Sequence, residues 1–106
     1  MKKTAYISAP ITGRPDYAVN KVFSSAEVEL VKMGYSVKNP LKIAKKVDEK
    51  TNEAGRTAIY EEYIANDMLH LLISDVVYFC RGWHESKGCQ LEFAAAKIYD
   101  KEIIFE

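Results

Sequence analysis

Two acidic side chains stand at positions where the surrounding helix pattern is apolar. Asp67 lies three residues after Ile64 and four before Leu71, so it projects from the apolar stripe of a predicted helix. Glu92 lies four residues after Gly88, in an alanine-rich helix that must pack closely. An unpaired buried carboxylate is costly, so each acid must reach a hydrogen-bond donor, a helix terminus or a cleft. Taken alone, each acid is equally consistent with a buried capping or salt-bridging residue.

A pair of acids aimed at one edge of a sheet is typical of chemistry at a sugar carbon. One carboxylate attacks or stabilises an oxocarbenium-like centre, while the other manages the proton on the leaving group. A helical side chain leans toward the helix N-terminus, so we expect Glu92 to point back toward Ser86, Lys87 and Gly88. The free N–H groups and positive dipole end of that helix suit a hydroxyl, a phosphate or a carboxylate.

The elements that position these acids follow from alternating short apolar runs and longer amphipathic ones. Strands are predicted at residues 4–8, 35–37, 75–79 and 102–105. Amphipathic helices are predicted at residues 17–33, 57–74 and 88–99. The alternation predicts an α/β fold, a single-domain three-layer sandwich with a four- to five-stranded parallel sheet of the Rossmann or flavodoxin-like kind. Ligands bind such sheets beyond the carboxyl ends of the strands. The loops at that edge are residues 9–16, 39–56 and 80–88.

Within the single domain 1–106, residues 41–56 form the most polar stretch. We expect a short helix followed by a mobile excursion there. Two interpretations remain open: a solvated surface insert, or a lid over a site. A third possibility for function uses the same stretch, as the binding surface of an interaction protein.

Composition and charge exclude several classes of protein. The chain has 106 residues, with 15 Lys and Arg against 15 Asp and Glu, so a protein that grips a nucleic-acid polymer is not expected. No apolar run approaches the roughly 18 residues of a membrane span, and no signal-peptide pattern opens the chain. Cys80 and Cys89 fit no metal or redox spacing, and we expect free thiols in the cytoplasm.

Nucleotide motifs of the common kinds are missing too. The sequence has neither Gly-x-Gly-x-x-Gly after its first strand nor a Gly-Lys-Ser/Thr loop. A dinucleotide dehydrogenase and a P-loop enzyme are therefore excluded. We expect neither a cofactor nor a metal ion.

Several short motifs occur together in a recognisable order. They are Tyr6-Ile7-Ser8-Ala9-Pro10-Ile11-Thr12-Gly13, Ser74-Asp75, Gly82-Trp83, and Ser86 followed by Gly88-x-x-x-Glu92. Along its whole length the chain resembles the nucleoside 2-deoxyribosyltransferase superfamily, and most closely its small members common in phage and bacterial genomes. It is also similar to the deoxynucleoside 5′-monophosphate N-glycosidases.

The resemblance implies a role for each matching residue. Glu92 matches the nucleophile that attacks the anomeric carbon and holds a covalent glycosyl intermediate. Asp67 matches an aspartate that handles the proton on the departing base, and Tyr6 matches a tyrosine near the sugar or the nucleophile. The positions expected to bind substrate are Ser8, Pro10, Thr12, Gly13, Arg14, Trp83, Ser86, Lys87 and Gly88.

Some positions depart from one branch of the superfamily or the other. The monophosphate glycosidases carry a phosphate-binding serine and arginine where this chain has Pro10 and Thr12. Ser86, in contrast, matches a phosphate-contacting serine of that same branch. The phosphorylation state of the substrate therefore stays open. Trp83 has two interpretations, stacking on a base or packing in the protein.

The expected function is cleavage or transfer at the N-glycosidic bond of a (deoxy)nucleoside or its 5′-monophosphate through a glutamate nucleophile. The alternative is a non-catalytic module that binds or sequesters a nucleotide on the same fold. The superfamily resemblance implies a homodimer or higher homo-oligomer. Tyr60, Tyr63, Tyr99 and their apolar neighbours agree with it, because they exceed what a monomer of this size needs on its surface.

Overall fold

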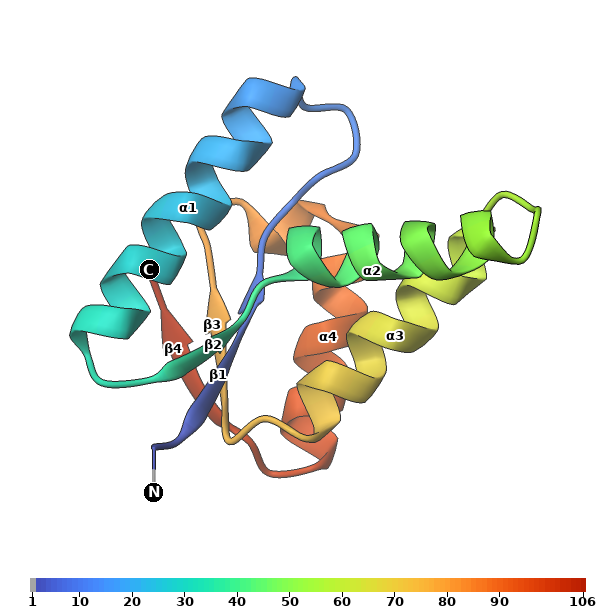
Figure 1. The fold of residues 1–106 in the computed structure, drawn as a ribbon. Coiled ribbons are helices and arrows are strands. Elements are labelled where there is room, and N and C mark those ends of the chain that lie inside the picture. Colours follow the sequence, from blue (N-terminus) through green and yellow to red (C-terminus); the bar gives the residue numbers. More distant parts are fainter. Residues whose placement is uncertain (1) are drawn as a thin grey trace.

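The computed structural model describes residues 2–106 and shows one sheet of four parallel strands (Figure 1). The strands are β1 (Thr4–Ser8), β2 (Ser36–Lys38), β3 (Val76–Phe79) and β4 (Glu102–Phe105). The helices are α1 (Asp16–Lys32), α2 (Pro40–Glu53), α3 (Tyr60–Leu72) and α4 (Lys87–Ile98), with a short 3-10 turn η1 (Trp83–Glu85) before α4. The strand order β2-β1-β3-β4 is flavodoxin-like, which confirms the predicted fold class.

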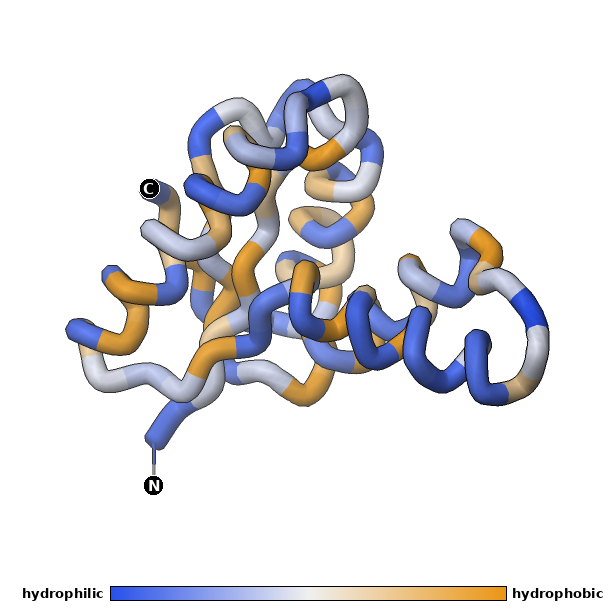
Figure 2. Tube along the Cα trace, turned by 45° about the horizontal axis from the view of Figure 1, so that its top comes forward, coloured by the Kyte–Doolittle hydropathy of each residue, from blue (hydrophilic) through white to orange (hydrophobic). Residues whose placement is uncertain are grey.

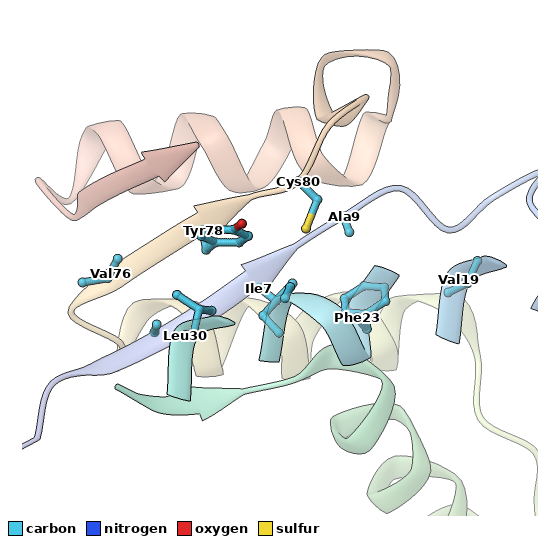
Figure 3. Packing of buried hydrophobic residues seen from close by; sticks show 10 residues of the cluster. Ile7, Ala9, Val19, Phe23, Leu30, Val76, Tyr78 and Cys80 are labelled. Carbon is cyan, nitrogen blue, oxygen red and sulfur yellow. The ribbon is translucent and has the colours of Figure 1, made fainter. Parts of the chain in front are cut away.

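One face of the sheet is covered by α1 alone. Val19, Phe23 and Leu30 recur along α1 at helical spacing and are buried against the sheet. They meet Ile7 of β1 and Tyr78 of β3 in one apolar cluster (Figure 3). Because burying each large apolar side chain contributes about 1.5–3 kcal/mol, this cluster fixes α1 against the two central strands.

The opposite face carries the other three helices. Tyr6 and Phe79 project from the strands into a second cluster, where they meet Leu71 of α3 and Ala96 of α4. Successive side chains of a strand point to opposite faces, so Tyr6 faces this layer while Ile7 faces α1. Any side chain two residues from Tyr6 on β1 must also face the layer of α3 and α4.

The carboxyl ends of β1 and β3 lie side by side at a reversal of strand order. Ser8 and Phe79 are register partners at the last positions of these two strands. The chain leaves β1 toward α1 on one face and leaves β3 toward α4 on the other. In open parallel sheets such a switch point is where ligands bind.

The expectation of a short helix and an excursion at residues 41–56 is wrong. The structure has a continuous helix of 14 residues there, α2, which packs against α3. The Asn39 side chain accepts the Leu41 N–H at 2.9 Å and Pro40 supplies the first helical turn, a favoured helix start. Ile43 and Val47, spaced by four, provide the buried stripe. Figure 2 shows why the helix is hard to recognise: its trace is largely hydrophilic.

The other predicted elements are confirmed, with small shifts at their ends. β1 and β4 have the predicted bounds, whereas α3 begins at Tyr60 and not at residue 57. The Glu62 carboxylate accepts the Ile59 N–H at 3.2 Å and is paired with Arg56 at 2.6 Å, which places the helix start after Ile59. No helix among residues 2–106 is long and apolar enough to cross a membrane.

The packing of α2 can be tested by truncating its buried stripe. Val47 is 7% exposed, so Val47→Ala should lower the free energy of unfolding by about 2 kcal/mol, the sum of lost burial and residual cavity. Lys45→Ala on the exposed side of the same helix should change it by less than about 0.5 kcal/mol. Urea denaturation of both variants measures the difference. Equal, near-zero effects would contradict the packed helix.

Candidate active site

A cavity of about 300 Å³ lies at the carboxyl end of β1, between the first loop and helices α2, α3 and α4. Its polar lining comes from four separate parts of the chain. Those side chains are Tyr6, Thr12, Asp67, Ser86 and Glu92. The cavity therefore lies at the edge of the sheet where the parallel strands predict a ligand site.

Glu92 is held by two hydroxyl groups of β1. The Tyr6 hydroxyl donates a short hydrogen bond to Oε2 of Glu92, and the Ser8 hydroxyl donates to Oε1 at 2.7 Å. Tyr6 and Ser8 are both fully buried. Because they are two residues apart on one strand, both point toward α4, and each takes one oxygen of the same carboxylate.

Burial opposes the ionisation of both acids in this cavity. It raises the pKa of Glu92, while the hydrogen bonds from Tyr6 and Ser8 act in the opposite direction. Burial, and secondly the negative charge of Glu92, raise the pKa of Asp67 to about 7. The pKa of Tyr6 lies well above its usual value, first through burial and then through the charge of Glu92, so its hydroxyl stays a donor.

This electrostatic arrangement separates the two acids into different roles. Glu92 has two donors on its carboxylate, whereas the desolvated Asp67 carries its proton up to about neutral pH. Two titratable groups whose surroundings differ in this way are suited to act as nucleophile and general acid. The arrangement can attack an electrophilic carbon and protonate the group that leaves it.

Helix starts and turns set the positions of these groups. The Ser86 hydroxyl caps α4 by accepting the Cys89 N–H at 3.3 Å, which fixes the first turn of the helix that carries Glu92. Before it, Gly82 adopts a φ of +84°, a conformation that favours glycine. The Arg14 guanidinium lies against Gly82, and its Nη2 would be 2.7 Å from an added Cβ.

The remaining wall of the cavity is apolar. The sequence placed residues 39–56 at this edge of the sheet, but it did not identify which of their side chains line the cavity. Pro40, Leu41 and Ala44 of α2 face Ile64 and Met68 of α3 across it. Of the two interpretations of residues 41–56, the solvated surface insert is wrong, because α2 packs on α3 and forms part of the cavity wall. The lid over a site stays a prediction. The Asn-Pro start and the spacing of apolar residues by four were the signals that could have identified it.

Tyr60 and Tyr63, singled out for a role in assembly, also line the cavity. Tyr60 is 65% exposed at the start of α3. The Tyr63 hydroxyl donates a short hydrogen bond to Asp48, which ties α3 to α2 beside the cavity.

The structure brings some of the predicted site residues together and leaves others apart. The cavity lining includes Tyr6, Thr12, Asp67, Ser86, Gly88 and Glu92. Outside that lining lie Ser8, Pro10, Gly13, Arg14, Trp83 and Lys87. Trp83 packs instead among aromatic rings, with its ring centroid 4.7 Å from that of Phe93. The described chain, residues 2–106, gathers no three His, Cys, Asp or Glu side chains that could hold a metal ion.

Comparison with known protein families finds a match over almost the full chain. The family model described as Domain of unknown function (DUF4406) matches residues 3–105. No curated protein matches the sequence.

The raised pKa of Asp67 predicts a pH-dependent stability difference. The raised pKa contributes stability that is fully present below the ordinary pKa of aspartate, about 3.9. This contribution is lost as pH rises through the pKa of Asp67 in the folded protein, about 7. The free energy of unfolding of Asp67→Asn minus that of wild type should therefore increase from pH 4 to pH 7, by up to about 4 kcal/mol. The difference should level off above pH 8. Urea denaturation across this range measures it. A difference that is constant with pH would contradict a desolvated Asp67.

Proposed function

The chain belongs to the DUF4406 family, and we propose that it cleaves or transfers at the N-glycosidic bond of a (deoxy)nucleoside or its 5′-monophosphate. One observation carries the proposal. The Glu92 carboxylate, held by two hydroxyls, shares a cavity with Asp67, whose pKa is about 7. Paired carboxyls, one that attacks and one that donates a proton, perform displacement at an anomeric carbon. The resemblance to the nucleoside 2-deoxyribosyltransferase superfamily supports the same chemistry.

In the proposed first step, an oxygen of Glu92 forms a bond to C1′ of the sugar. The C1′–N bond breaks, its electron pair goes to the base nitrogen, and Asp67 supplies the proton that the base needs. In the second step, water or a second base attacks C1′ and gives its proton to Asp67, and the electron pair of the C1′–O bond returns to Glu92. Water makes the protein a hydrolase, and a second base makes it a transferase.

The polar and the apolar residues of the cavity lining suit the two parts of such a substrate. The hydroxyls of Thr12 and Ser86 lie in the lining with the acids, where a sugar offers hydroxyl partners. The apolar wall of Leu41, Ile64 and Met68 offers a flat base the burial that drives binding. We place this reaction in cytoplasmic nucleotide metabolism.

The proposal is tested by a mass-spectrometric screen for released free base. Nucleosides and 5′-monophosphates would be incubated with the protein, each with and without a second base. Glu92→Ala should lower the rate of base release by about 10³-fold or more, because it removes the attacking carboxylate. Glu85→Ala is the matched control, since Glu85 is an exposed glutamate before the same helix and lies outside the cavity.

The outcomes of this screen separate the candidate functions. Release that vanishes only in Glu92→Ala supports the nucleophile, and base exchange identifies a transferase. Retained ligand binding with no release from any substrate would contradict an enzyme and leave a nucleotide-sequestering module.

We also propose that two copies assemble over the face formed by α3 and α4. An apolar groove crosses these helices and shares Tyr60, Ile64, Met68 and Leu91 with the cavity lining. At its far end, Ile98 is 72% exposed. A second copy seated in the groove would bury these residues and close the mouth of the cavity.

A charge placed in the groove tests this assembly. Ile98→Glu should convert a dimer of twice 12.0 kDa into a monomer, because the charge would be buried at the interface without a partner. Val28→Glu adds the same charge on the exposed side of α1 and should leave the dimer intact. Sedimentation equilibrium measures the mass. A monomeric wild-type protein, or a dimer that Ile98→Glu leaves unchanged, would overturn the proposal.

A further inference from the structure

Ser8 contacts Glu92, the candidate nucleophile, but is not part of the cavity lining. Its side chain is fully buried at the end of β1, and it lies outside the cavity lining that contains Tyr6 and Glu92. Its hydroxyl donates to Oε1 of Glu92 at 2.7 Å. The place of Ser8 in the first motif predicts direct contact with substrate. The hydrogen bond that the structure shows goes to Glu92.

We propose that Ser8 is a positioning residue, which holds Oε1 of Glu92 so that Oε2 is the oxygen that attacks the sugar. This inference rests on the proposed function. Tyr6, the partner of Oε2, lines the cavity, whereas Ser8, the partner of Oε1, does not. On this difference we assign Oε2 to the cavity side of the carboxylate. Tyr6 occupies one of its lone pairs and leaves the other for the new bond.

The strand that carries both hydroxyls makes this hold rigid. β1 is hydrogen-bonded to β2 on one side and to β3 on the other, so it is a central strand. Ser8 is itself the register partner of Phe79. A carboxylate fixed by two donors on such a strand loses little further freedom when it attacks, which is the advantage of a preorganised group.

Ser8 would act in both steps of the reaction. In the first, Oε2 of Glu92 bonds to C1′ and the C1′–N electron pair leaves with the base, which takes the proton of Asp67. Oε1 becomes the carbonyl oxygen of the glycosyl ester and keeps its hydrogen bond from Ser8. In the second, water attacks C1′ and gives its proton to Asp67, while the C1′–Oε2 electron pair returns to Glu92. The Ser8 hydroxyl then stabilises the charge that reappears on the carboxylate.

The first measurement needs no catalysis. Removal of a donor to the ionised form raises a carboxyl pKa, so Ser8→Ala should raise the pKa of Glu92 by about one pH unit or more. Ser8→Thr keeps the hydroxyl and should restore the wild-type value. Carbon-13 NMR of the glutamate carboxyls reports the titration. Tyr6 and Asp67, which act electrostatically with Glu92, keep their side chains in both variants, whereas Cys89 loses its hydrogen bond with Ser8 in Ser8→Ala and keeps that hydroxyl partner in Ser8→Thr.

The second measurement uses base release. Ser8→Ala should lower kcat about ten- to hundred-fold with little change in KM, since the lost hydrogen bond acts on the nucleophile and not on substrate binding. Ser8→Thr should recover most of kcat. An unchanged pKa of Glu92 together with unchanged kcat in Ser8→Ala would overturn the positioning role. If the pKa shifts but wild-type protein releases no base from any substrate, Ser8 still positions Glu92 and the proposed function is what fails.

Discussion

The buried carboxylate of Glu92 is the feature on which the rest of the site depends. A charge taken out of water is costly unless hydrogen bonds replace its hydration. Here the two replacements, Tyr6 and Ser8, come from one central strand, and the acid comes from a helix at the other end of the chain. Their alignment requires α4 to pack closely on the sheet, and the buried small residues Ala95 and Ala96 allow that approach. Sheet, helix and acid therefore form one unit.

The pKa of the second acid, Asp67, depends in part on the first acid, Glu92. Asp67 lines the same cavity on α3, where burial and the charge of Glu92 disfavour its ionisation. Burial disfavours the ionisation of both carboxyls, and two neighbouring carboxyls do not ionise together easily, so the two hydroxyl donors favour the charge on Glu92 over the charge on Asp67. This division of roles costs stability near and above neutral pH, because the fold holds Asp67 away from water. Such a cost is common at active sites, where the arrangement that suits the chemistry is not the most stable one.

Sequence patterns could predict what depends on neighbours along the chain. The bounds of β1 and β4, and the apolar stripes that expose Asp67 and Glu92 as unusual, all follow from local spacing. Contacts between distant residues leave no such pattern. Ser8 and Glu92 are 84 residues apart, so their hydrogen bond is visible only in the structure. Trp83 packs with Phe79, Phe93 and Phe105, which come from three elements. The full length of α2 was not predicted, because its polar composition conceals a narrow buried stripe.

The hydrogen-bonded groups of the cavity and its apolar residues come largely from different elements. Tyr6, Asp67 and Glu92 lie on a central strand and two helices packed against it, where small changes in backbone position would break their contacts. The apolar wall includes residues from the start of α2 and from α3. The wall residues that α2 supplies determine part of the volume and polarity offered to a ligand, and they make none of the hydrogen bonds to Glu92. In the proposed reaction, the identity of the base would then depend on α2 and α3, while the chemical step would depend on the contact between β1 and α4.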